Sequence, residues 1–157
     1  MVSATIAMAM LAANLSGSYA CVVDRQIIIN EGRANLPNEQ VRFEGVGQRD
    51  WRFGVRVSGT QTPTVVITWP ENPLNIAGTF RAMTLAPGQV AVAVGSRGPC
   101  MFTEQACVSI FELSAHDDGS AAFSILPAGS VRDHLLGSRR IFHVILMGTC
   151  QPRRASK

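Results

Sequence analysis

The sequence predicts an all-β protein, a single-domain antiparallel β-sandwich or small β-barrel of about eight strands. The chain has 157 residues, the length of one domain, and 46% of them are hydrophobic, enough for one core. After residue 20 there is no convincing amphipathic helix, whereas alternation of apolar and polar residues recurs, as in strands with one buried face. The connections are short and contain no crossover helices, so the strands should run antiparallel.

Eight segments carry the strand pattern. The clearest is 51–58, in which Trp51, Phe53, Val55 and Val57 fall on one face and polar residues on the other. Segment 75–85 is ambiguous, because Gly78 interrupts it, although 79–85 could form a short strand. The predicted strands are 22–29, 40–45, 51–58, 64–69, 89–94, 107–115, 121–126 and 140–147.

Turn residues connect these strands. His116, Asp117, Asp118 and Gly119 lie between two apolar runs, and Asp-Gly is a strong hairpin signal because the turn needs a positive φ. We interpret this tip as a turn, and not as a metal or acid–base site. Residues 131–138 are expected to make a short helical turn.

A second hairpin is predicted at residues 47–50, joining segment 40–45 to segment 51–58. It would place Arg42, Glu44, Arg52 and Arg56 on one outer face. Such a face could bind an anion, but a solvated face with weak cross-strand ion pairs is the more common arrangement, and we favour it.

The N-terminus is typical of an export signal. Residues 1–23 contain no charged side chain, 4–13 form an apolar run, and Ser18 and Ala20 suit signal peptidase. The run is too short to span a bilayer, which takes about 20 residues. We therefore predict a signal peptide at 1–20, an antiparallel β domain at 21–150 and a disordered tail at 151–157, in a secreted or periplasmic bacterial protein. The first residues lack the usual Lys or Arg, so a buried N-terminal helix in a cytosolic protein stays open.

The four cysteines, Cys21, Cys100, Cys107 and Cys150, all follow the predicted cleavage site. An even number in an exported chain indicates disulfides, and three pairings are possible. We favour Cys100–Cys107, which closes a short loop, and Cys21–Cys150, which brackets the domain. Their spacing does not fit a zinc site, so no metal and no cofactor are predicted.

The loop between Cys100 and Cys107 is the candidate binding site. A disulfide would hold Met101, Phe102, Thr103 and Glu104 on a rigid loop, and a preorganised apolar tip loses little entropy on binding. In the alternative arrangement, Phe102 packs back onto the end of the sheet. The loop therefore suggests a non-enzymatic binding or structural protein whose partner is another protein or a component of the cell envelope.

Two other functions stay open. The near-terminal cysteine pair is similar in architecture to that of exported bacterial β-barrel inhibitors of lysozyme, which implies a hydrolase inhibitor. A small enzyme could use His134 or His143, although no motif supports a catalytic site. Nucleic-acid binding is not expected, because the basic residues do not form a stripe with aromatics between them. The sequence does not indicate an oligomeric state.

Overall fold

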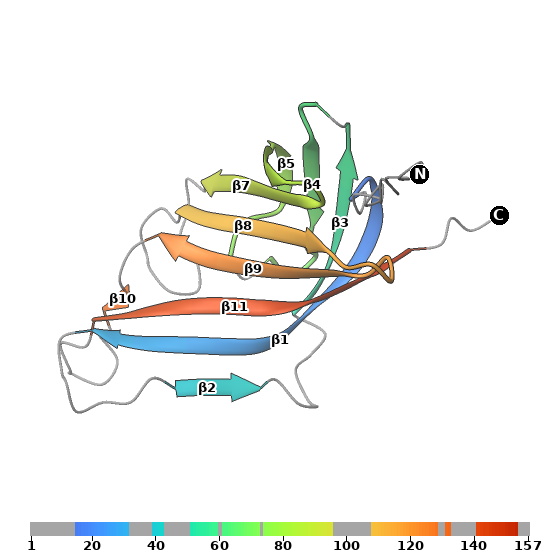
Figure 1. The fold of residues 1–157 in the computed structure, drawn as a ribbon. Helices are drawn as coiled ribbons and strands as arrows, with labels where there is room; N and C mark the ends of the chain where they lie inside the picture. Colours follow the sequence, from blue (N-terminus) through green and yellow to red (C-terminus); the bar gives the residue numbers. More distant parts are fainter. Residues whose placement is uncertain are drawn as a thin grey trace, which may run out of the picture.

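The protein is an antiparallel all-β structure, as the sequence predicts, and its sheet curls into a nearly closed nine-strand barrel (Figure 1). The strand order is β5-β4-β3-β1-β11-β9-β8-β7-β6, with β2 paired to β1 and β10 to β11. The computed structural model describes residues 15–31, 39–42, 51–59, 61–72, 74–95, 108–128, 131–132 and 141–153. Its strands are β1 (Gly17–Glu31), β2 (Glu39–Arg42), β3 (Arg52–Ser58), β4 (Thr64–Thr68), β5 (Gly78–Arg81), β6 (Met83–Ala86), β7 (Gln89–Gly95), β8 (Val108–Ala115), β9 (Ala121–Ala128), β10 (Val131–Arg132) and β11 (Ile141–Pro152).

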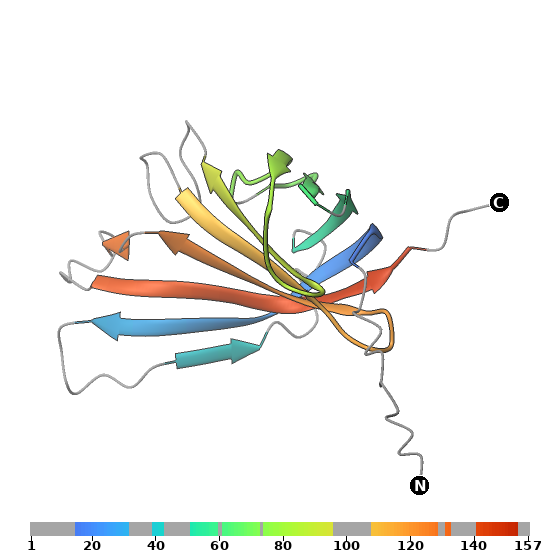
Figure 2. The ribbon, with the colours of Figure 1, turned by 45° about the horizontal axis from the view of Figure 1, so that its top comes forward.

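β1 and β11 are the longest strands, with 15 and 12 residues, and they pair along almost their whole length. One edge of β1 has two successive partners: residues 17–22 pair with β3 and residues 25–28 pair with β2. An irregularity between Val23 and Arg25 separates the two halves. The predicted hairpin between β2 and β3 is therefore wrong, because β1 is long enough to pair with both strands (Figure 2).

A bent segment brings the two ends of the barrel sheet together. β5 pairs with β4 and β6 pairs with β7, yet only Ala82 separates β5 from β6 in the chain. Ala82 is buried, and its N–H donates to the Pro63 carbonyl at 2.8 Å. The ambiguous segment 75–85 thus contributes to two short strands that reach both edges.

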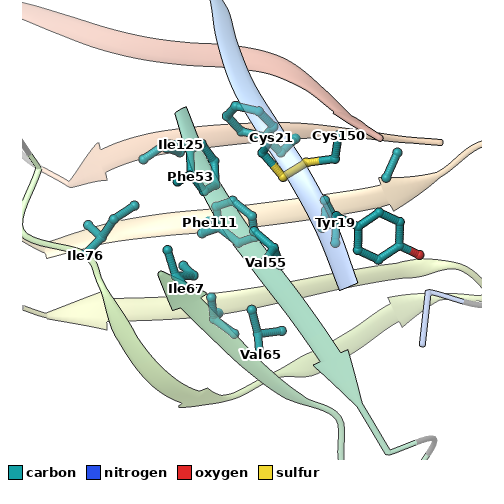
Figure 3. Packing of buried hydrophobic residues seen from close by; sticks show 14 of the residues in the cluster. Tyr19, Cys21, Phe53, Val55, Val65, Ile67, Ile76, Phe111, Ile125 and Cys150 are labelled. Atoms are coloured by element: carbon teal, nitrogen blue, oxygen red, sulfur yellow. A yellow bond between two sulfur atoms is a disulfide. The ribbon is translucent and has the colours of Figure 1, made fainter. Parts of the chain in front are cut away.

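The alternation of apolar and polar residues along the strands determines which side chains form the barrel core. On β3, Phe53, Val55 and Val57 are buried and the intervening residues are not, as predicted. Phe53 stacks on Trp69 with ring centroids 4.5 Å apart, and Phe123 meets Phe53 edge-to-face at 4.9 Å. Cys21 and Cys150 are joined by a disulfide, so that predicted pairing is confirmed. Figure 3 shows this disulfide among the buried hydrophobic residues of the core.

The sheet extends beyond the limits that the sequence suggests for the domain. β1 begins at Gly17, and Leu15 and Tyr19 are buried in the core. β11 ends at Pro152, so the first residues of the expected tail belong to a strand. A signal-peptide cut after Ala20 stays a prediction; residues 1–14 and 154–157 lie outside the described residues.

The hairpin of β8 and β9 is confirmed, with Gly119 at a φ of 82° in its turn. The predicted helical turn at 131–138 is wrong at its start, because Val131 and Arg132 pair with β11 as a strand. The remaining residues of that segment lie outside the described part. Among the described residues, no helix has the length and hydropathy needed to cross a membrane.

Candidate functional site

A row of apolar side chains crosses the outer face of the barrel. We define the outer apolar row as Ala93, Ile110, Leu126, Ile145 and Ile27, which lie on five neighbouring strands. Ile110 pairs with Ala93 on β7 and with Leu126 on β9, and Ile145 on β11 pairs with Ile27 on β1. Leu126 follows Ile125, the partner of Leu146, so the antiparallel register brings Leu126 beside Ile145. The row therefore runs continuously across β7, β8, β9, β11 and β1.

The row is apolar, and its end on β7 and β8 is open to solvent, since Ala93 and Ile110 are exposed. Ile110 is 42% exposed, and Val108, two residues before it on the same face, is 47% exposed. Leu126, Ile145 and Ile27 are half-buried. A solvated sheet face usually carries polar residues, and a contiguous exposed apolar patch with a polar rim often marks an interaction site.

A polar rim borders the row on one side. The next residues along the strands are Glu112, Ser124 and Arg25, together with Met147. The Ser124 hydroxyl donates to the Glu112 carboxylate at 3.3 Å, and both side chains are half-buried. This hydrogen bond holds the polar edge on β8 and β9, whereas Met147 on β11 continues the apolar surface past the row.

On the side away from the polar rim, the outer apolar row leads to the strand ends that the predicted recognition loop connects. Gly95, the last residue of β7, pairs with Val108, the first residue of β8. Residues 96–107 therefore connect two paired strand ends. The candidate binding residues, Met101, Phe102, Thr103 and Glu104, and the Cys100–Cys107 pairing lie outside the described residues and stay predictions.

The enzyme alternative, which uses His134 or His143, stays a prediction. His143 lies on β11 with its backbone opposite Ile29, and its side chain lies outside the described residues. His134 lies outside them as well.

At the tip of the β8–β9 hairpin, Asp118 stabilises the turn through two hydrogen bonds from Ser120. Its carboxylate accepts the Ser120 hydroxyl at 2.5 Å and the Ser120 N–H at 2.9 Å. These bonds stabilise the charged form and lower the pKa of Asp118, the hydroxyl having the larger effect. The contacts fit the interpretation of this tip as a turn.

One end of the barrel contains a small pocket of about 170 Å³. It lies between the start of β1, the β3–β4 connection and the β6–β7 turn, and Leu15, Val57, Pro63 and Gln89 are among its lining residues. The described residues that line it carry no charge. Ligand pockets for drug-sized molecules usually have about 300–1,000 Å³, so this one suits only a small neutral group.

Sequence reasoning missed the outer apolar row, although a signal was present. In segment 107–115 the apolar residues occur on both faces: Phe111 and Leu113 on one, Val108 and Ile110 on the other. A single alternating face explains the first pair only. The second pair could have indicated an exposed apolar surface, because the outer face of a barrel strand normally meets water.

Comparison with known proteins gives no family. No family model matches the chain, and no curated protein matches it. A solved structure, the monomer form of the M. tuberculosis PknI sensor domain, is similar over 88% of this chain and 87% of that one. The identity is 13% and the TM-score is 0.45.

Proposed function

We propose that this protein is a non-enzymatic binding domain of an exported protein, and that it contacts a partner protein through the outer apolar row. The observation that carries the proposal is the exposure of Ile110 and Val108 on a sheet face that is otherwise expected to be polar. Burial of such side chains at an interface supplies the main favourable free energy of association, and a polar rim such as Glu112 and Ser124 adds specificity.

The disulfide supports the location outside the cytoplasm. Cys21 and Cys150 are joined, and both are buried. Structural disulfides form and persist mainly in oxidising compartments, which in bacteria are the periplasm and the exterior. The apolar segment at the N-terminus is the second feature that supports export.

The connection between β7 and β8 would enlarge the same surface. It joins the strand ends Gly95 and Val108, next to the exposed end of the row. A Cys100–Cys107 disulfide would restrict this connection and place Met101 and Phe102 on a rigid segment, which lowers the entropy lost on binding. Non-reducing mass spectrometry of the exported protein should find this bridge; a free thiol on Cys100 would remove the rigid-loop part of the proposal.

The binding surface is tested with one variant and a matched control. Ile110→Ser removes the large side chain of the row that is 42% exposed, and Leu85→Ser makes the same kind of change at a residue that is 50% exposed on β6. The wild type and both variants are used as bait for an envelope extract, and the captured proteins are quantified after crosslinking.

The expected result is a partner that the wild type and Leu85→Ser capture equally and that Ile110→Ser captures at least about tenfold less, the effect of one interface hot spot. Equal capture by all three baits, or no specific capture by any of them, would contradict the proposal. Thermal unfolding of each bait shows whether a loss comes from misfolding.

A further inference from the structure

Three arginines gather on the outer face of the barrel, away from the outer apolar row. Arg52, Gly54 and Arg56 alternate on β3 and face outward, since the residues between them are buried. Arg153 follows β11, and its N–H donates to the Ser18 carbonyl at 2.7 Å. This bond continues the β1–β11 pairing and holds Arg153 beside the sheet.

The side chain of Arg153 reaches across β1 to β3. Its Nη2 atom lies 3.8 Å from the point where a Cβ of Gly54 would be. Gly54 lies between Arg52 and Arg56, and alternate residues of a strand are about 6.6–6.8 Å apart. The guanidinium of Arg153 therefore lies over Gly54, and Arg52 and Arg56 are the outward-facing residues on either side of Gly54 along β3.

These charges have no acidic partner among the described residues. The ion pair found in that part of the chain joins Arg25 to Asp24 at 3.8 Å, and Arg52, Arg56 and Arg153 are all exposed. Like charges on neighbouring positions of a sheet repel. An anion placed between the three guanidinium groups would convert this repulsion into attraction.

We propose that Arg52, Arg56 and Arg153 form a binding site for a phosphate group. The planar guanidinium donates two parallel N–H bonds to an oxyanion, and three such groups can satisfy the oxygens of a tetrahedral phosphate. Ser18 pairs with Arg56, and its backbone carbonyl accepts the Arg153 N–H. In a chain that is not cut after Ala20, Ser18 is exposed on the same face and offers a hydroxyl donor. The phosphate is either a free ion or the headgroup of a phospholipid.

This inference is independent of the proposed protein-binding surface. The outer apolar row crosses β1 and β11 at Ile27 and Ile145, whereas the phosphate site lies at the other end of these strands, near Ser18 and Arg153. One surface can therefore be abolished while the other is kept, and the two proposals fail separately.

The test uses the full chain and two probes at a fixed ionic strength of about 0.1 M, where nonspecific surface electrostatics are partly screened. One arm titrates inorganic phosphate and follows the backbone amides of Ser18 and Gly54 by NMR. The other measures sedimentation with phosphatidylglycerol vesicles, with phosphatidylcholine vesicles as the neutral comparison. Binding in the first arm identifies a free phosphate ligand, and binding only in the second identifies a lipid headgroup.

The variants are Arg52→Gln, Arg56→Gln and Arg153→Gln, with Arg81→Gln as the control. Arg81 is exposed on β5 opposite Thr64, so it loses the same charge outside the site. We expect each site variant to weaken binding about tenfold, the effect of one charge-assisted hydrogen bond, and Arg81→Gln less than twofold. Arg153→Lys keeps the charge but loses the planar guanidinium that donates two parallel hydrogen bonds. Its affinity for phosphate should therefore lie between that of Arg153→Gln and that of the wild type.

Absence of binding in both arms would overturn the site. Equal weakening by Arg81→Gln would also overturn it, because binding would then follow net charge alone. Circular dichroism of each variant confirms that these exposed substitutions leave the fold intact, so that a loss of binding is assigned to the site.

Discussion

The ring of Phe123 lies against the backbone of Gly148, its direct partner on the neighbouring strand. The two residues pair between β9 and β11. A Cβ at Gly148 would be 2.7 Å from Cζ of Phe123 and would also overlap the Val22 carbonyl oxygen on β1. Gly148 is buried at the point where β1 and β11 approach closely, beside the irregularity at Val23. The absence of a side chain at Gly148 is what allows both the aromatic packing and the close strand approach.

Gly148→Ala should therefore destabilise the protein by about 3 kcal/mol, because the backbone of β1 would have to shift and the Phe123 ring would have to leave its place. Gly95→Ala is the matched control, since a Cβ there meets nothing within 4 Å, and it should change the free energy of unfolding by less than about 0.5 kcal/mol. Urea unfolding followed by tryptophan fluorescence measures both. Equal midpoints for the two variants would show that the barrel tolerates a side chain at Gly148.

Removing the terminal disulfide should lower stability by about 2–5 kcal/mol. Cys21 and Cys150 are 129 residues apart, and a bridge that closes so long a loop strongly restricts the unfolded chain. The double variant Cys21→Ala/Cys150→Ala leaves no buried thiol, and its urea midpoint is compared with that of the oxidised wild type. An unchanged midpoint would contradict the expected role. A further shift of the double variant on adding reductant would report a second bridge.

The sequence predicted the parts of the fold that depend on local pattern. On β3 the alternation of Phe53, Val55 and Val57 identifies the buried face, because a strand with one buried face has no other register that hides its apolar residues. The Asp-Gly turn at Asp118 is also predictable from local sequence, because the conformation of such a turn depends on the turn residues themselves.

Features that depend on distant pairing could not be predicted. The length of β1 decides that β2 pairs with β1 and not with β3, and nothing near residues 43–50 carries that information. Likewise Arg153 is in a polar terminal segment that resembles a tail, and only the pairing of Tyr19 with Pro152 places it on the sheet. The phosphate site proposed here depends on that pairing, so the sequence showed only its β3 half, Arg52 and Arg56.

A chain that begins at Cys21 should be less stable than one that begins at Leu15, by at least about 3 kcal/mol. Leu15 and Tyr19 are buried, the Tyr19 hydroxyl donates to the Leu15 carbonyl at 3.1 Å, and residues 17–20 pair with β3. Losing two buried side chains of this size costs several kcal/mol. Urea unfolding of the two chains measures the difference, and equal midpoints would contradict it. N-terminal sequencing of the exported protein then shows whether the natural chain is cut after Ala20.

The hairpin tip should lose stability in acid through Asp118. Hydrogen bonds from the Ser120 hydroxyl and then the Ser120 N–H lower the pKa of Asp118 below its ordinary value of 3.8. Because the folded pKa is the lower one, the stabilisation is present above the unfolded pKa and is lost as the pH falls through the folded pKa. NMR titration of the Asp118 carboxyl should give a midpoint below 3.8, and Ser120→Ala should move it upward, whereas Ser58→Ala on β3 should not. A wild-type midpoint at or above 3.8 would show that the Ser120 bonds do not hold the carboxylate in solution.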